Sequence, residues 1–118
     1  MTASNEPAPI PTLRLIVERN QVWPRMAAKY GVENPLPPWK TSLDGLCDAL
    51  DHNHCEAGVP SFKERRDEED LLSSTIYSDL PHPESQLVSL AHSLMVRGII
   101  NEAELQERLS AIRARLEA

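Results

Sequence analysis

The chain has 118 residues, of which 41% are hydrophobic and 25% charged, and its net charge is −6. This length suffices for one small domain with a modest core. The acidic balance argues against nucleic-acid binding, which requires clustered lysine and arginine, and the apolar runs are too short to span a membrane. The N-terminal sequence lacks the basic and apolar regions of a secretory signal, so we expect a cytoplasmic protein with reduced cysteines.

Residues 1–37 are predicted to form an N-terminal arm with a short helix and a proline-rich linker. Three prolines in residues 1–11 indicate an extended start. Thr12 is expected to cap a first helix, Pro24 to interrupt it, and Gly31 to end a second turn. The stretch "ENPLPPW" then reads as an extended linker, because each proline restricts the residue before it.

The remaining residues, 38–118, are predicted to form helices only. A helix is expected over 42–54, and Ser61 with Glu64 forms a capping-box signature before a helix over 62–80. Another is expected over 84–97, ended by Gly98, and the last follows Asn101, with apolar residues at spacings of four, three and four. The fold is therefore predicted to be all-α, a small irregular domain of about five helices. Its narrow apolar stripes suggest packing on partner subunits.

Both cysteines lie in the stretch "LCDALDHNHCEAG", which offers Cys47, His52, His54 and Cys55 as possible metal ligands. Zinc sites usually have two short ligand pairs separated by a longer loop, and this spacing differs. Cys47 falls on the apolar side of its predicted helix, and the histidines fall in its last turn, where they meet the helix dipole. The spacing favours a helix end over a metal site, which stays as the alternative.

Arg65 and Arg66 follow the capping box in an acidic helix. The ordinary interpretation is a solvated pair balanced by glutamates at helical spacing. The functional alternative has one arginine reach into a partner and bind an oxyanion through its planar fork. The sequence offers no nucleophile motif, no glycine-rich phosphate loop and no H-E-x-x-H zinc motif.

The order of motifs over residues 38–110 resembles the N-terminal helical region of nitrile hydratase β subunits and of the small β subunit of thiocyanate hydrolase. Trp39, Leu43 (or Leu46) and Phe62 match a tryptophan that opens one helix and a phenylalanine that starts the next. Glu64-Arg65 matches an "E-R" pair, and Leu72, Thr75 and Tyr77 match "L-x-x-T-x-Y". The run "LVSLAHSLMVRGIINEAEL" matches the closing helix pair. The family's aromatic run "Y-Y-E-H-W" is replaced here by "IYSDL".

The resemblance implies a β-type subunit of a complex that hydrates a C≡N substrate, a lyase whose isolated β-type chain would be inactive. Co(III) or Fe(III) would be held by an α-type subunit through a C-x-x-C-S-C motif with oxidised cysteines, and this chain would bind no metal. A separate subunit would supply the β-barrel that a full β subunit carries. Arg65, with Arg66 as the fallback, would hydrogen-bond the oxidised cysteine oxygens, and Tyr77 would place a hydroxyl nearby.

A second interpretation of the same resemblance is a nitrile hydratase activator. Activators share this helical region and an "S-T-x-Y"-type segment, here Ser74 to Tyr77. Such a metallochaperone would deliver cobalt to the α subunit, and the "DHNHC" stretch would then be a candidate transfer site. The Glu64-Arg65 pair favours the subunit. A third alternative is an unrelated helical interaction module. The sequence leaves open whether the substrate is a simple nitrile, thiocyanate or a larger natural-product nitrile, and whether the metal is cobalt or iron.

Overall fold

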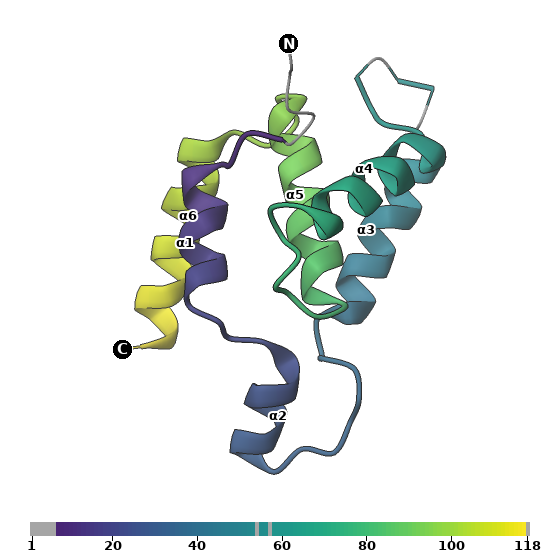
Figure 1. Ribbon diagram of the computed structural model, residues 1–118. Coiled ribbons are helices and arrows are strands. Elements are labelled where there is room, and N and C mark those ends of the chain that lie inside the picture. The colour runs from purple at the N-terminus through teal and green to yellow at the C-terminus, as the bar shows by residue number, and fades with distance from the viewer. Residues whose placement is uncertain (1–6, 54, 57, 118) are drawn as a thin grey trace.

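A computed structural model describes residues 7–53, 55–56 and 58–117. In these ranges the chain forms six helices and no strand, which confirms the predicted all-α class. Figure 1 shows them in chain order: α1 (Pro11–Glu18), α2 (Trp23–Tyr30), α3 (Lys40–His52), α4 (Phe62–Ser74), α5 (Glu84–Val96) and α6 (Glu102–Leu116). The helix beyond the predicted number is α2, where Pro24 lies in the first turn and is tolerated because that turn needs no N–H donor.

Helix α5 joins two apolar clusters. In the first, Val88 packs with Leu13 of α1, Leu72 of α4 and Tyr77 from the loop after α4. In the second, α5 packs against α3, and the buried members are Leu43, Leu50, Leu90 and Leu94. Burial of Leu13 at 2% exposure shows that α1 belongs to the packed domain. The boundary between residues 37 and 38 stays a prediction.

The helix ends follow the predicted local signals at most positions. Ser61 Oγ accepts from the Glu64 N–H at 3.2 Å, and Glu64 Oε1 accepts from the Ser61 N–H at 3.0 Å, which completes the capping box. Asn101 caps α6 by accepting from the Glu104 N–H at 3.0 Å. Gly98 adopts a φ of 76° directly after α5, a conformation that suits glycine because it has no Cβ.

Two predicted helix ends are wrong. The cap of α1 is Ile10, and Thr12 lies inside the helix, where its N–H and Oγ1 donate to Glu102 Oε2 at 3.1 and 2.8 Å. Helix α4 ends at Ser74 and does not reach residue 80. There the Tyr77 N–H donates to the Leu72 carbonyl at 3.0 Å, and the turn buries the tyrosine side chain in the first cluster.

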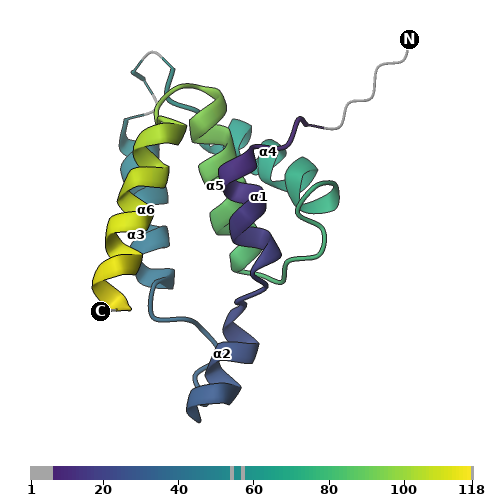
Figure 2. The same cartoon turned by 90° about the vertical axis from the view of Figure 1, so that its left-hand side faces the viewer.

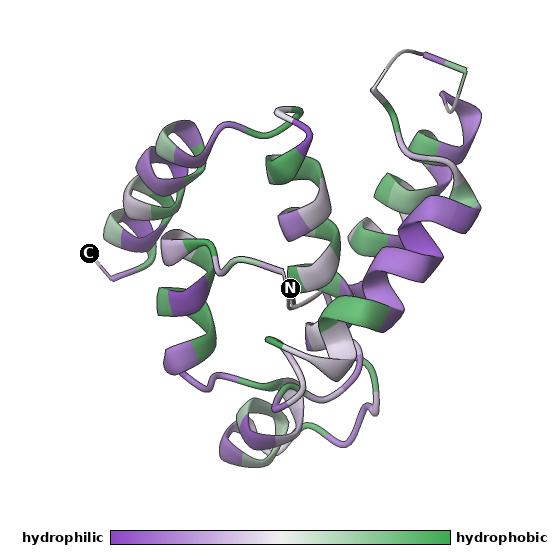
Figure 3. Ribbon diagram, turned by 45° about the horizontal axis from the view of Figure 1, so that its top comes forward, coloured by the Kyte–Doolittle hydropathy of each residue, from purple (hydrophilic) through white to green (hydrophobic). Residues whose placement is uncertain are grey.

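The packing leaves the molecule open. Its accessible surface is 8100 Å², against about 6,400 Å² for a compact monomer of this mass. Its radius of gyration is 15.2 Å, against about 13.5 Å for a compact chain of this length. Figure 2 shows α2 extending away from the other helices, and Figure 3 shows apolar segments in several helices. Large apolar side chains on several of them are exposed. None of the helices in the described ranges has the length and apolar character needed to cross a bilayer.

Candidate functional site

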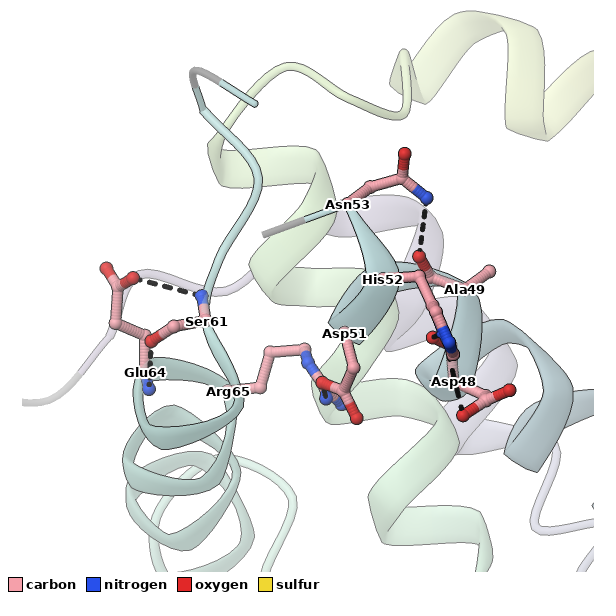
Figure 4. A network of polar contacts seen from close by, with 8 residues as sticks. All are labelled: Asp48, Ala49, Asp51, His52, Asn53, Ser61, Glu64 and Arg65. Atoms are coloured by element: carbon pink, nitrogen blue, oxygen red, sulfur yellow. Dashed lines mark hydrogen bonds and ion pairs between the residues drawn. The ribbon is translucent and has the colours of Figure 1, made fainter. Parts of the chain in front are cut away.

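Arg65 bridges the first turn of α4 and the last turn of α3. The capping box fixes the start of α4 four residues before Arg65, and Phe62 opens the helix. From this turn the Arg65 side chain extends across to Asp51, and its Nη2 donates to Asp51 Oδ1 (Figure 4). The ion pair therefore joins two helices whose intervening loop runs over residues 53–61.

The Arg65 guanidinium is largely covered. Its side chain is 10% exposed, whereas the Asp51 side chain is 39% exposed. The guanidinium carbon lies 5.7 Å from the centroid of the Phe62 ring, a cation–π distance. Its Nε is buried and meets no hydrogen-bond acceptor among the described residues. Arginine carries five N–H donors in a planar fork, so this site holds a charged donor with unused capacity.

Cys47, a residue of α3, lies beside the Arg65 side chain. It is half-buried and packs against the second apolar cluster, the position expected of a small core residue. Burial raises the pKa of the Cys47 thiol, and the neighbouring Arg65 charge and hydrogen bond oppose that shift only in part. The raised pKa favours the protonated thiol, which is a weaker nucleophile than the thiolate.

The other predicted ligands lie around the end of α3. The His52 ring N–H at Nδ1 donates to the Asp48 carbonyl at 2.8 Å, and this bond raises the pKa of His52. Cys55 is exposed, and His54 lies outside the described residues. Within the part of the chain that the structure describes, no three His, Cys, Asp or Glu side chains come together as a metal site.

The structure separates Arg65 from the other two predicted site residues. Arg66, one residue on, is exposed. Tyr77 lies beyond the far end of α4, and the helix between Arg65 and Ser74 rises about 14 Å. The Tyr77 hydroxyl lies 2.7 Å from His92 Nδ1, and the two rings meet edge to face at 5.6 Å.

Sequence reasoning missed a second polar group next to Tyr77. His92 is 4% exposed, and burial lowers its pKa although the charge of Glu68 acts in the opposite direction. Arg97 Nη1 donates to Glu68 Oε1 at 2.6 Å, and this pairing lowers the pKa of Glu68. The sequence does contain a signal for the burial of His92. This residue lies three positions after Ser89 and four after Val88, so it falls on the buried face of α5.

The two polar groups differ in what they can do. The Tyr77 hydroxyl and His92 Nδ1 hydrogen-bond each other and tie the loop after α4 to α5. Arg65 is a fixed, largely covered cation between α3 and α4, where Asp51 accepts one of its hydrogen bonds and the Phe62 ring lies beside the guanidinium. No protein-family model, curated protein or solved structure matches this chain, so the family resemblance rests on its own residues.

Proposed function

We propose that this chain is a β-type subunit of a nitrile hydratase- or thiocyanate hydrolase-type complex, which hydrates a C≡N substrate. The observation that carries the proposal is Arg65, the arginine at the matching "E-R" position, whose guanidinium the fold anchors on Asp51 and covers to 10% exposure. In this proposal Arg65 binds the oxidised cysteine oxygens of an α-type subunit.

The environment of Arg65 suits that role physically. Sulfenate and sulfinate oxygens are anions, and a guanidinium can donate to two of them at once. Asp51 and the ring of Phe62 hold the side chain in one orientation, so little rotamer entropy is lost when the partner binds. The low exposure of Arg65 strengthens each charged hydrogen bond, because water competes less for the donors.

The implied metal belongs to the partner subunit. When bound there, Co(III) or Fe(III) supplies Lewis-acid activation of water or of the C≡N carbon. The share of this chain is to hold the oxidised cysteine oxygens through Arg65, to exclude water at the subunit contact, and to keep the arginine oriented through Asp51. The open surface of 8100 Å² agrees with a chain that is covered by larger partners.

One co-expression experiment tests the proposal. The chain is produced with a C-x-x-C-S-C subunit and a barrel-bearing subunit, and hydration of nitriles and of thiocyanate is measured on the purified complex. Arg65→Ala is expected to lower turnover by about 10–100-fold, the usual effect of removing a group that orients metal ligands. The complex should still assemble by size exclusion, and the exposed neighbour variant Arg66→Ala should keep full turnover.

Full activity of Arg65→Ala would contradict the assignment of the arginine. Failure of the chain to co-elute with the other subunits would contradict the subunit function. Transient binding to the α-type subunit, with cobalt on the isolated chain by elemental analysis, would instead establish the activator.

A further inference from the structure

Helix α6 carries a seam of apolar residues that the fold leaves uncovered. Their spacing of four, three and four is that of alternating d and a positions in a coiled-coil heptad. The seam consists of Leu105, Leu109, Ile112 and Leu116. Leu105 packs on the first cluster, but the other three are 37%, 43% and 76% exposed. No residue of this helix is buried, although all its positions lie in the described ranges.

Helix α1 supplies a second apolar wall opposite this seam. Leu15 and Ile16 are 59% and 38% exposed, and they line, together with Leu109, Ile112 and Leu116 of the seam, a groove of about 510 Å³ between α1 and α6. Both hydrogen bonds from Thr12 to Glu102 hold the N-terminal ends of the two helices together. Figures 1 and 2 show α1 and α6 on the same side of the molecule. The groove therefore lies between two helices that are joined at their N-terminal ends.

The charges beside the seam are basic. The heptad positions that flank it, e and g, are occupied by Gln106, Arg108, Arg113 and Arg115. The groove itself is lined by Arg19 of α1, by Arg113 and by Glu117, while Arg108 and Arg115 lie outside its lining. Arg108 pairs with Glu104 at 3.1 Å and Arg113 with Glu117 at 2.9 Å. Both are exposed pairs between successive helical turns, which contribute little and can exchange for a partner's carboxylates.

These charges disfavour a second copy of the chain as the occupant. In a parallel pair, each g position meets the e position five residues on, so Arg108 would face Arg113 of the other copy. In an antiparallel pair, g positions meet g positions, and Arg108 would face Arg108 or Arg115. Like charges at these positions select against a pairing.

We propose that the groove between α1 and α6 binds an amphipathic helix of a partner protein, whose leucine-rich seam is flanked by glutamate or aspartate. This surface does not depend on the proposed catalytic complex, since it uses neither Arg65 nor a metal. Recognition combines burial of the seam with ion pairs to the flanking arginines.

Two labelled synthetic peptides of three heptads test the proposal by fluorescence anisotropy with the full chain. Both have leucine at a and d; one has glutamate and the other lysine at e and g. The glutamate peptide is expected to bind at least about ten-fold more tightly at low salt, and the difference should shrink at high salt. The triple variant R108E/R113E/R115E should reverse this preference while the leucines stay in place.

Ile112→Asp should abolish binding of the glutamate peptide. Its matched control is Leu46→Asp on α3, because both side chains are 43% exposed and neither substitution is expected to disturb the core. Circular dichroism checks that each variant keeps its helices. Equal binding of the two peptides by the unmodified chain, or an equal loss in both variants, would overturn the proposal. Sedimentation that shows a dimer of the unmodified chain, lost in Ile112→Asp, would overturn it in favour of a second copy.

Discussion

Removing the hydroxyl of Tyr77 isolates the energy of one buried hydrogen bond. Tyr77 and His92 are 3% and 4% exposed, and the phenol oxygen lies 2.7 Å from His92 Nδ1. Tyr77→Phe keeps the ring and its edge contact with the imidazole but leaves Nδ1 buried without a partner. An unsatisfied buried polar atom costs about 1–3 kcal/mol.

Urea unfolding followed by circular dichroism measures this loss. With an m-value of about 1.5 kcal/mol/M, the midpoint of Tyr77→Phe is expected to fall by about 0.7–2 M. The matched control is Tyr30→Phe, because Tyr30 is 65% exposed and its hydroxyl reaches water. That variant should change the free energy of unfolding by less than about 0.5 kcal/mol.

A double-mutant cycle shows whether the loss belongs to the pair. His92→Leu alone strands the Tyr77 hydroxyl, whereas the double variant removes both polar groups. The double variant should therefore be less destabilised than the sum of the single variants, with a coupling of about 1 kcal/mol or more. Strict additivity, or an unchanged midpoint in Tyr77→Phe, would refute the reasoning.

Acidification and loss of the helix cap provide two further tests. Burial lowers the pKa of His92 below its ordinary 6.5, so the unfolded chain takes up this proton first and the stabilisation present above pH 6.5 is lost as the pH falls towards the folded pKa. The free energy of unfolding should decline from pH 7 to 5, by at most about 1.4 kcal/mol per pH unit for one proton. His92→Leu should flatten this decline, and an identical slope in the variant would contradict the assignment. Below pH 4.5 the lowered pKa of Glu68, which Arg97 pairs, adds a further loss. Ser61→Ala removes the capping box and should cost about 1 kcal/mol, or about 4 °C in melting temperature, whereas Ser78→Ala, exposed in the loop after α4, should change little; equal melting temperatures would show that the cap is not stabilising.

Local chemistry explains which parts of the fold were predictable. Ser61 with Glu64, and Asn101, mark helix starts because a side chain three residues or fewer away satisfies the backbone donors. Gly98 marks an end because its φ is set by the turn itself. Thr12 misled the prediction, because a residue 90 positions away, Glu102, accepts its hydrogen bonds. Local pattern carries no information about such a contact.

In the candidate site, too, some features follow from the local sequence and others depend on contacts between distant residues. Cys47 was placed on the apolar side of its helix by periodicity, and it packs there. Arg65 was singled out by a resemblance and by its type, but its bond to Asp51 depends on how the loop returns α4 to α3. Tyr77 is buried where its hydroxyl meets His92, which lies on another helix. Tertiary geometry of this kind has no local signature.

The position of α5 has a consequence for how the molecule fluctuates. Because α5 contributes side chains to both apolar clusters, its backbone amides become exposed only when both clusters separate, and they should report the global opening of the domain. Helix α6 has no buried residue, and α2 has only Ala27. Either helix can therefore detach at a small cost in free energy while the two apolar clusters around α5 stay packed. The outer helices are thus free to adjust to a bound molecule on a faster timescale than the clusters around α5 rearrange.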